Sequence, residues 1–87
     1  MNFNIVVDPT AKRNLKLLRR QNPSLFSLLS KLIDSLELNP FAGKPLQGDK
    51  HHCYSLRSGD YRIIYEIYLT EKTIHIIRVG HRREVYR

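Results

Sequence analysis

The sequence predicts an α+β domain with the element order β-α-α-β-β-β, in which a helical hairpin packs on one face of a small, antiparallel-rich sheet. Two adjoining stretches with helical spacing of apolar residues occupy positions 9 to 38. Three runs rich in β-branched and aromatic residues follow at 53–57, 61–69 and 73–80, joined by short turns. A chain of 87 residues has room for one core, so residues 1–87 are predicted to form a single domain.

The N-terminal part is predicted to be a short strand followed by two capped helices. Phe3 to Val7 is an apolar run and is the predicted strand. Asp8-Pro9 and Asn22-Pro23 each place a capping side chain before a proline, which is typical of a helix start. The helices are predicted over 9–21 and 23–38, and their short connection makes them a hairpin. The second helix has an apolar stripe predicted to pack on the sheet: Leu25, Leu28, Leu29, Leu32, Ile33 and Leu36.

Turn residues divide the rest of the chain. Residues 39–48 contain two prolines and two glycines and are predicted to be a loop. Ser-Gly-Asp at 58–60 and Thr-Glu-Lys at 70–72 are predicted to close antiparallel hairpins. The expected pairings are Tyr68 near Thr73, Arg57 beside Tyr61, and Tyr61 and Arg62 opposite Val79 and Gly80.

Basic residues are predicted to gather at one end of this sheet. Arg57 and Arg62 flank the first turn, and the last strand runs into His81-Arg82-Arg83. We therefore expect Arg57, Arg62, His81 and Arg82 to lie within side-chain reach of one another. Clustered guanidinium groups repel unless an anion lies between them, and the arginine fork matches a phosphate. The alternative is that these arginines pair with nearby carboxylates: Asp60, Glu66 and Glu84.

Positive charge is also concentrated on the first helix. Fifteen Lys and Arg against eight Asp and Glu leave a net charge of +7, which favours a polyanionic partner over a merely soluble basic surface. The stretch from Pro9 to Gln21 has no acidic residue. It is either a solvated flank or a surface that docks RNA, the ribosome or an acidic partner. Its basic residues are Lys12, Arg13, Lys16, Arg19 and Arg20.

Composition excludes several classes of protein. The single Cys53 excludes an internal disulfide framework and a cysteine-based zinc site. No run approaches the roughly 18 apolar residues that span a bilayer, so a cytosolic protein without a membrane partner is expected. The histidines lack a carboxylate cluster at ligand spacing, and neither a metal nor another cofactor is predicted.

Three motifs in order resemble the RelE/ParE superfamily of toxins. They are Leu-Arg-Ser-Gly-Asp-Tyr-Arg-Ile-Ile-Tyr at 56–65, Val-Gly-His-Arg-Arg-Glu-Val-Tyr-Arg at 79–87 and the loop at 38–46. The resemblance covers essentially the whole chain and implies a RelE-like toxin domain over 1–87 from a type II toxin–antitoxin system. A RelE-type member is a ribosome-dependent endoribonuclease, or mRNA interferase, that cuts mRNA in the A site. It assembles with an acidic, RelB-like antitoxin.

The resemblance also implies roles for individual residues. Arg62, Arg82 and Tyr86 fall at the positions of catalytic residues of the RelE type. RNA or phosphate contacts are predicted for Arg57, His52, Lys44, Arg83 and Arg87. Cys53 and Ser55 depart from the pattern, because RelE-type enzymes often carry two lysines there, one of them a proposed general base.

The missing lysines leave the proton-transfer group open. Histidine suits proton transfer at neutral pH. His81 is the preferred candidate because it lies beside Arg82, whereas His51 and His52 are alternatives in the loop. His75 lies within a strand and is predicted to be structural.

Two other functions are compatible with the sequence. The first is a ParE-like toxin that inhibits DNA gyrase without catalysis. The second is a non-toxic module whose basic surfaces only bind an antitoxin or DNA. Retention of Arg62, Arg82 and Tyr86 favours the nuclease, while the missing lysines favour the alternatives.

Overall fold

The computed structural model describes residues 2–46 and 53–85 and confirms the predicted α+β architecture. A five-stranded sheet has the strand order β1-β5-β4-β3-β2. β1 is parallel to β5, and the other neighbours are antiparallel. The elements are β1 (Asn4–Val7), α1 (Pro9–Gln21), α2 (Pro23–Ser35), β2 (Lys44–Pro45), β3 (Cys53–Ser58), β4 (Tyr61–Tyr68), β5 (Thr73–His81) and α3 (Arg82–Val85).

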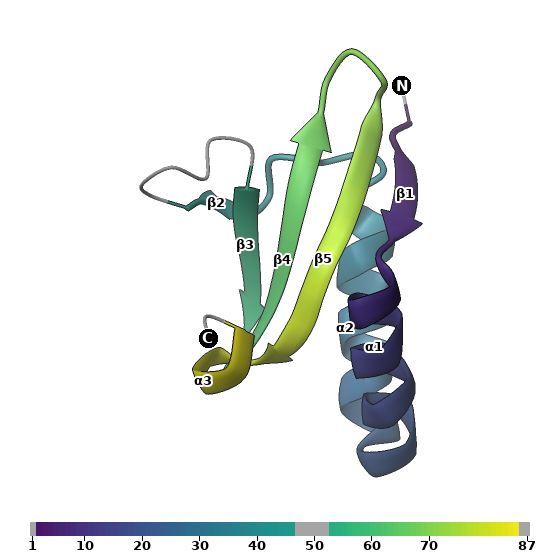
Figure 1. Ribbon diagram of the computed structural model, residues 1–87, viewed down its shortest axis with the longest axis vertical. Helices are drawn as coiled ribbons and strands as arrows, with labels where there is room; N and C mark the ends of the chain where they lie inside the picture. The colour runs from purple at the N-terminus through teal and green to yellow at the C-terminus, as the bar shows by residue number, and fades with distance from the viewer. Residues whose placement is uncertain (1, 47–52, 86–87) are drawn as a thin grey trace.

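The sheet separates two layers (Figure 1). α1 and α2 lie together on one side of it, whereas α3 turns back at the end of β5 on the other side. We call the side covered by α1 and α2 the helix face and the opposite side the open face.

The helix starts follow their predicted caps. The carboxylate of Asp8 accepts a hydrogen bond from Thr10 N at 3.3 Å, and the amide of Asn22 accepts one from Leu25 N at 3.2 Å. α2 ends at Ser35, three residues before the predicted end. Residues 36–38 form turns, since Asn39 precedes a proline and is disfavoured in the helical region.

The core lies between the helix pair and the helix face. It consists of Ala11, Leu18, Leu29, Ile33, Leu36, Ile63, Tyr65, Ile67, Ile74, Ile76 and Val79. Most of the predicted stripe of α2 packs there, with Leu25 and Leu32 partly buried against the cluster. Leu28 is the exception: it is 46% exposed, so its assignment to the core was wrong.

A β-bulge interrupts the pairing of β4 with β5. Tyr68 pairs with Thr73 as predicted, and the ladder continues to Tyr65 opposite Ile76. The next pair is Ile64 with Arg78, so Ile77 is an extra residue in β5. The interruption shifts the remaining pairs by one.

The bulge decides which side chains of β5 face the helices. Arg62 lies opposite Gly80 and Tyr61 lies opposite His81, one residue beyond the partners Val79 and Gly80 of the predicted register. Because directly opposed residues share a face, Val79 and His81 lie on the helix face, while Arg78 and Gly80 lie on the open face.

β2 lies inside the segment predicted to be a loop. Lys44 pairs with Ser55, and Pro45 pairs with Tyr54. The buried Tyr65 holds this segment: its hydroxyl donates to the carbonyl of Pro40 at 2.8 Å and accepts from Gly43 N at 2.9 Å. A Cβ on Gly43 would lie 2.8 Å from the carbonyl oxygen of Ser55, so only glycine permits this close approach.

Candidate functional site

Cross-strand pairing arranges the open face in three rows. The row nearest the β3–β4 turn contains Arg57, Arg62 and Gly80. The middle row contains Lys44, Ser55, Ile64 and Arg78. The distal row contains Cys53, Glu66 and His75. The cations of this face therefore come from four neighbouring strands and surround Ser55 and Ile64.

A pocket of about 330 Å³ opens on this face. Lys44, Ser55, Arg57 and Arg62 line it together with backbone and apolar groups of 42–46 and Leu56. None of these lining residues is acidic. The pocket is therefore positively charged and wide enough for a phosphate group.

Arg62 is held by carbonyl oxygens. Its Nη1 donates to the carbonyl of Gly59 at 3.0 Å and to that of Tyr61 at 3.3 Å, which draws the guanidinium toward the turn. Among the described residues, neither Arg57 nor Arg62 forms an ion pair with a carboxylate. The charge of Arg62 is fixed in place without being neutralised, which favours binding of an anion.

His81 does not join the arginines, contrary to expectation. Its ring packs edge-to-face on Tyr61, with centroids 5.7 Å apart, and its Nδ1 accepts from Arg83 N at 3.2 Å. It lines a small pocket of about 80 Å³ against α1, together with Asn14 and Gln21. The bulge at Ile77 is the reason, because it places His81 on the helix face.

α3 keeps the other basic residues near the predicted end of the sheet. Arg82 N donates to the carbonyl of Asp60 at 2.7 Å, which ties the start of α3 to the β3–β4 turn. Arg82 and Arg83 are exposed. Four predicted site residues lie outside the described residues: His51, His52, Tyr86 and Arg87.

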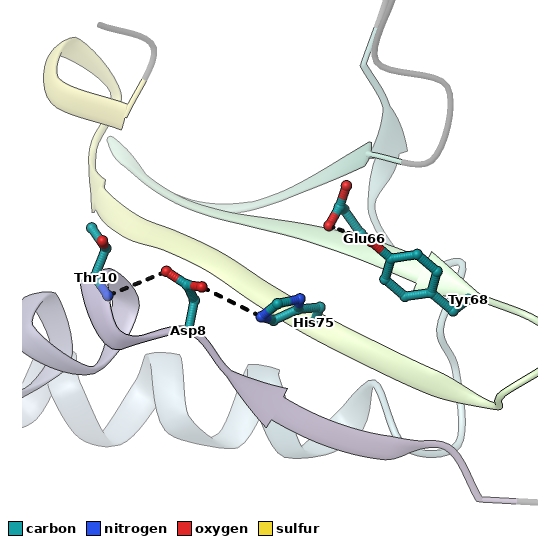
Figure 2. Close-up of polar contacts among 5 residues, drawn as sticks. All are labelled: Asp8, Thr10, Glu66, Tyr68 and His75. Atoms are coloured by element: carbon teal, nitrogen blue, oxygen red, sulfur yellow. Dashed lines mark hydrogen bonds and ion pairs between the residues drawn. The ribbon is translucent and has the colours of Figure 1, made fainter.

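The distal row of the open face contains one carboxylate, that of Glu66 (Figure 2). Glu66 accepts from the hydroxyl of Tyr68 at 2.8 Å, and this hydrogen bond raises the pKa of Tyr68. The Sγ of Cys53 donates to the other oxygen of Glu66 at 3.9 Å. His75 Nε2 lies 3.5 Å from Asp8 Oδ1, which links β5 to the cap of α1. These contacts agree with a structural role for His75.

The basic residues of α1 belong to a different surface. α1 covers the helix face, so its side chains do not reach the pocket on the open face (Figure 1). Arg19 lies over the ring of Phe26, with Cζ 5.9 Å from the centroid. The exposed basic residues are Lys12, Arg13, Lys16, Arg19 and Arg20.

The sequence did not single out Arg78, and it did not predict that Lys44 lies opposite Ser55. Both placements depend on register, through the bulge in β5 and the short pairing of β2. No local pattern indicates either feature.

Within residues 2–46 and 53–85, no group of three His, Cys, Asp or Glu side chains is arranged to hold a metal ion. In the same part of the chain, no helix has the length and apolar character needed to cross a membrane.

Comparison with solved structures identifies the class of fold. The toxin–antitoxin complex RelBE2 from Mycobacterium tuberculosis aligns with a TM-score of 0.81 and 29% identity, covering 93% of this chain and 99% of the other. The YoeB/ParE toxin from Agrobacterium tumefaciens aligns with a TM-score of 0.81 and 20% identity, covering 91% and 98%. The protein therefore has the fold of the RelE/ParE toxin superfamily.

Sequence comparison gives the family. Toxin RelG of M. tuberculosis is 32% identical over 88 residues, covering 100% of this chain and 99% of that protein. The family model for the ParE toxin of the type II toxin–antitoxin system parDE matches residues 5–86. The chain belongs to this toxin family.

Proposed function

We propose that the protein is a RelE-type toxin that cuts mRNA in the ribosomal A site. Residues 1–87 act as one toxin domain in the cytoplasm. The observation that carries this proposal is the open-face pocket, in which Lys44, Arg57 and Arg62 converge without a carboxylate among the lining residues. Arg82 begins α3 beside the same turn and supplies a further cation at this end of the sheet.

The proposed reaction is attack of a ribose 2′-OH on the adjacent phosphate. It forms a 2′,3′-cyclic phosphate and releases a 5′-OH, with one proton removed from the nucleophile and one delivered to the leaving oxygen. Negative charge accumulates on the phosphorane, and Arg57 and Arg62 stabilise it. Since the carbonyls of Gly59 and Tyr61 already orient Arg62, little reorganisation is required.

Lys44 is the proposed proton-transfer group. His81 lies on the helix face, and its Nδ1 already accepts a hydrogen bond. Lys44 lines the pocket and pairs with Ser55, one of the positions where the RelE type carries lysine. Lysine is an established general acid or base in enzymes. Tyr86, His52, Arg83 and Arg87 remain proposed RNA contacts on the strength of the resemblance.

An acidic antitoxin is the proposed protein partner. The similar RelBE2 structure is a toxin–antitoxin complex. The exposed cations of α1 offer such a partner a surface of opposite charge, which favours fast and specific association. The result would be a toxin–antitoxin hetero-oligomer.

Primer extension on a defined mRNA, with and without ribosomes, tests the proposed reaction. We expect ribosome-dependent cuts within A-site codons and products that carry a 2′,3′-cyclic phosphate. Intact mRNA in both reactions, with protein shown to be folded by circular dichroism, would contradict the proposal.

ParE-like inhibition of DNA gyrase is a second candidate, favoured by the ParE description of the matching family. A supercoiling assay with purified gyrase separates the two candidates. Inhibition of gyrase together with intact mRNA would establish the ParE-like activity.

A further inference from the structure

We propose that Arg78 is an RNA-binding residue of the open face and contacts a phosphate next to the one held by Arg57 and Arg62. This inference rests on the proposed function and adds a second phosphate position to it. The site then recognises a length of single-stranded backbone and not one isolated phosphate.

The β-bulge determines the face of the sheet on which Arg78 lies. With the regular register expected from the β4–β5 turn, Arg78 would pair with Ile63 and enter the helix-face core. The extra residue Ile77 moves it opposite Ile64 and onto the open face. Bulges commonly re-aim a side chain at a functional site.

The middle row indicates the direction in which the RNA backbone crosses the sheet. Lys44 and Arg78 lie at its two ends, with Ser55 and Ile64 between them. Three strand spacings separate the ends, or about 14 Å across the sheet. This span is too wide for one phosphate, and it suits a backbone that crosses the strands with a cation at each end.

Arg62 and Arg78 occupy separate positions. They are diagonal neighbours, about 7–8 Å apart at the backbone. The carbonyls of Gly59 and Tyr61 draw the Arg62 guanidinium toward the turn, away from the row of Arg78. Gly80, opposite Arg62, adds no side chain between them.

The structure of a phosphodiester indicates that Arg78 contacts a different phosphate from the one held by Arg57 and Arg62. A phosphodiester has two non-bridging oxygens, and one arginine fork engages both. Arg57 and Arg62 already face each other across one pair of strands and suffice for one phosphate. In this proposal Arg78 contacts the next phosphate along the RNA. Ile64, which lies between Ser55 and Arg78 in the middle row, is apolar and only 7% exposed.

Salt-dependent binding of a short single-stranded RNA tests the proposal. The RNA carries 2′-O-methyl riboses, so 2′-OH attack cannot occur. Loss of one phosphate contact reduces the slope of log K against log salt by about 0.7 for a single strand. We expect that reduction for Arg78→Gln, whereas Arg78→Lys retains most of the slope. Lys31→Gln is the matched control, because it removes one exposed charge from α2 on the other side of the sheet.

Neutral methylphosphonate linkages locate the contact. Double-mutant cycles on the binding free energy combine one protein substitution with one neutral linkage. Arg78→Gln should couple to a different linkage from the one that couples to Arg62→Gln. An unchanged slope for folded Arg78→Gln, or coupling of both arginines to the same linkage, would overturn the inference alone. Parent protein that binds no RNA at low salt would overturn the inference, whereas the proposed function fails only if mRNA also stays intact in the presence of ribosomes.

Discussion

Two roles are proposed for Lys44, that of a cation and that of a proton donor or acceptor. A single substitution separates them. Lys44→Arg keeps the charge but replaces the amine, which is the proposed proton-transfer group, with a guanidinium that does not release its proton. We expect Lys44→Arg to bind RNA like the parent and to cut it more slowly by about a hundredfold or more. Single-turnover cleavage at saturating ribosomes measures this effect. A Lys44→Arg protein that cuts at the parent rate would limit Lys44 to charge stabilisation.

Tyr65 connects the core to the position of Lys44. Tyr65→Phe leaves the ring in place but deprives the carbonyl of Pro40 and the N–H of Gly43 of their partner. We expect a loss of about 1–3 kcal/mol in the free energy of unfolding, because buried polar groups are left unpaired. Urea denaturation measures the loss. Tyr68→Phe is the control, since its hydroxyl is exposed; an equal loss in both variants would contradict the account.

The pKa of Tyr65 predicts a pH dependence. Burial raises it from the ordinary value of 10.0, with Tyr54 adding to the rise and the Gly43 N–H opposing it. The folded state therefore holds the proton more tightly than the unfolded state. Its contribution is fully present below about pH 10 and is lost as pH rises above that value. We expect the unfolding free energy of Tyr68→Phe to fall more steeply at alkaline pH than that of the double variant Tyr65→Phe/Tyr68→Phe. Parallel curves would show that Tyr65 is not the source of the pH dependence.

The bulge predicts that β5 tolerates the deletion of one residue but not the deletion of another. Deleting Ile77 removes the extra residue but retains the pair of Tyr65 with Ile76 and that of Ile64 with Arg78. We expect this deletion to fold and to bind RNA. Deleting Val79 should instead place Arg78 or Gly80 in the core and cost about 2–5 kcal/mol or more. Thermal unfolding of both proteins decides the point, and equal destabilisation would contradict the register.

The same bulge limits what the sequence alone predicted. Local signals were sufficient for both helix starts, because Asp8 and Asn22 cap the turns that follow them. Turn residues likewise located the two hairpins. The bulge carries no local signal, so His81 was expected within reach of the arginines and Arg78 was overlooked. β2 was missed for a related reason, since its pairing depends on the distant hydroxyl of Tyr65.

For the molecule as a whole, the sheet keeps two basic surfaces apart. The pocket is on the open face. α1, which carries the exposed cations, covers the helix face (Figure 1). A partner that covers α1 alone would leave the pocket accessible. The two surfaces can therefore be altered independently, and the same chemical change made on each side compares them directly.

The rate of mRNA cleavage after Arg62→Gln and after Arg20→Gln distinguishes a catalytic site on the open face from one on α1. Both changes remove one guanidinium, but Arg62 lines the open-face pocket and Arg20 is exposed on α1. At saturating ribosomes, Arg62→Gln should lower the rate by about a hundredfold or more, and Arg20→Gln should stay within a few-fold of the parent. Near-parent cleavage by folded Arg62→Gln, with a large loss in Arg20→Gln, would contradict the placement of the site on the open face.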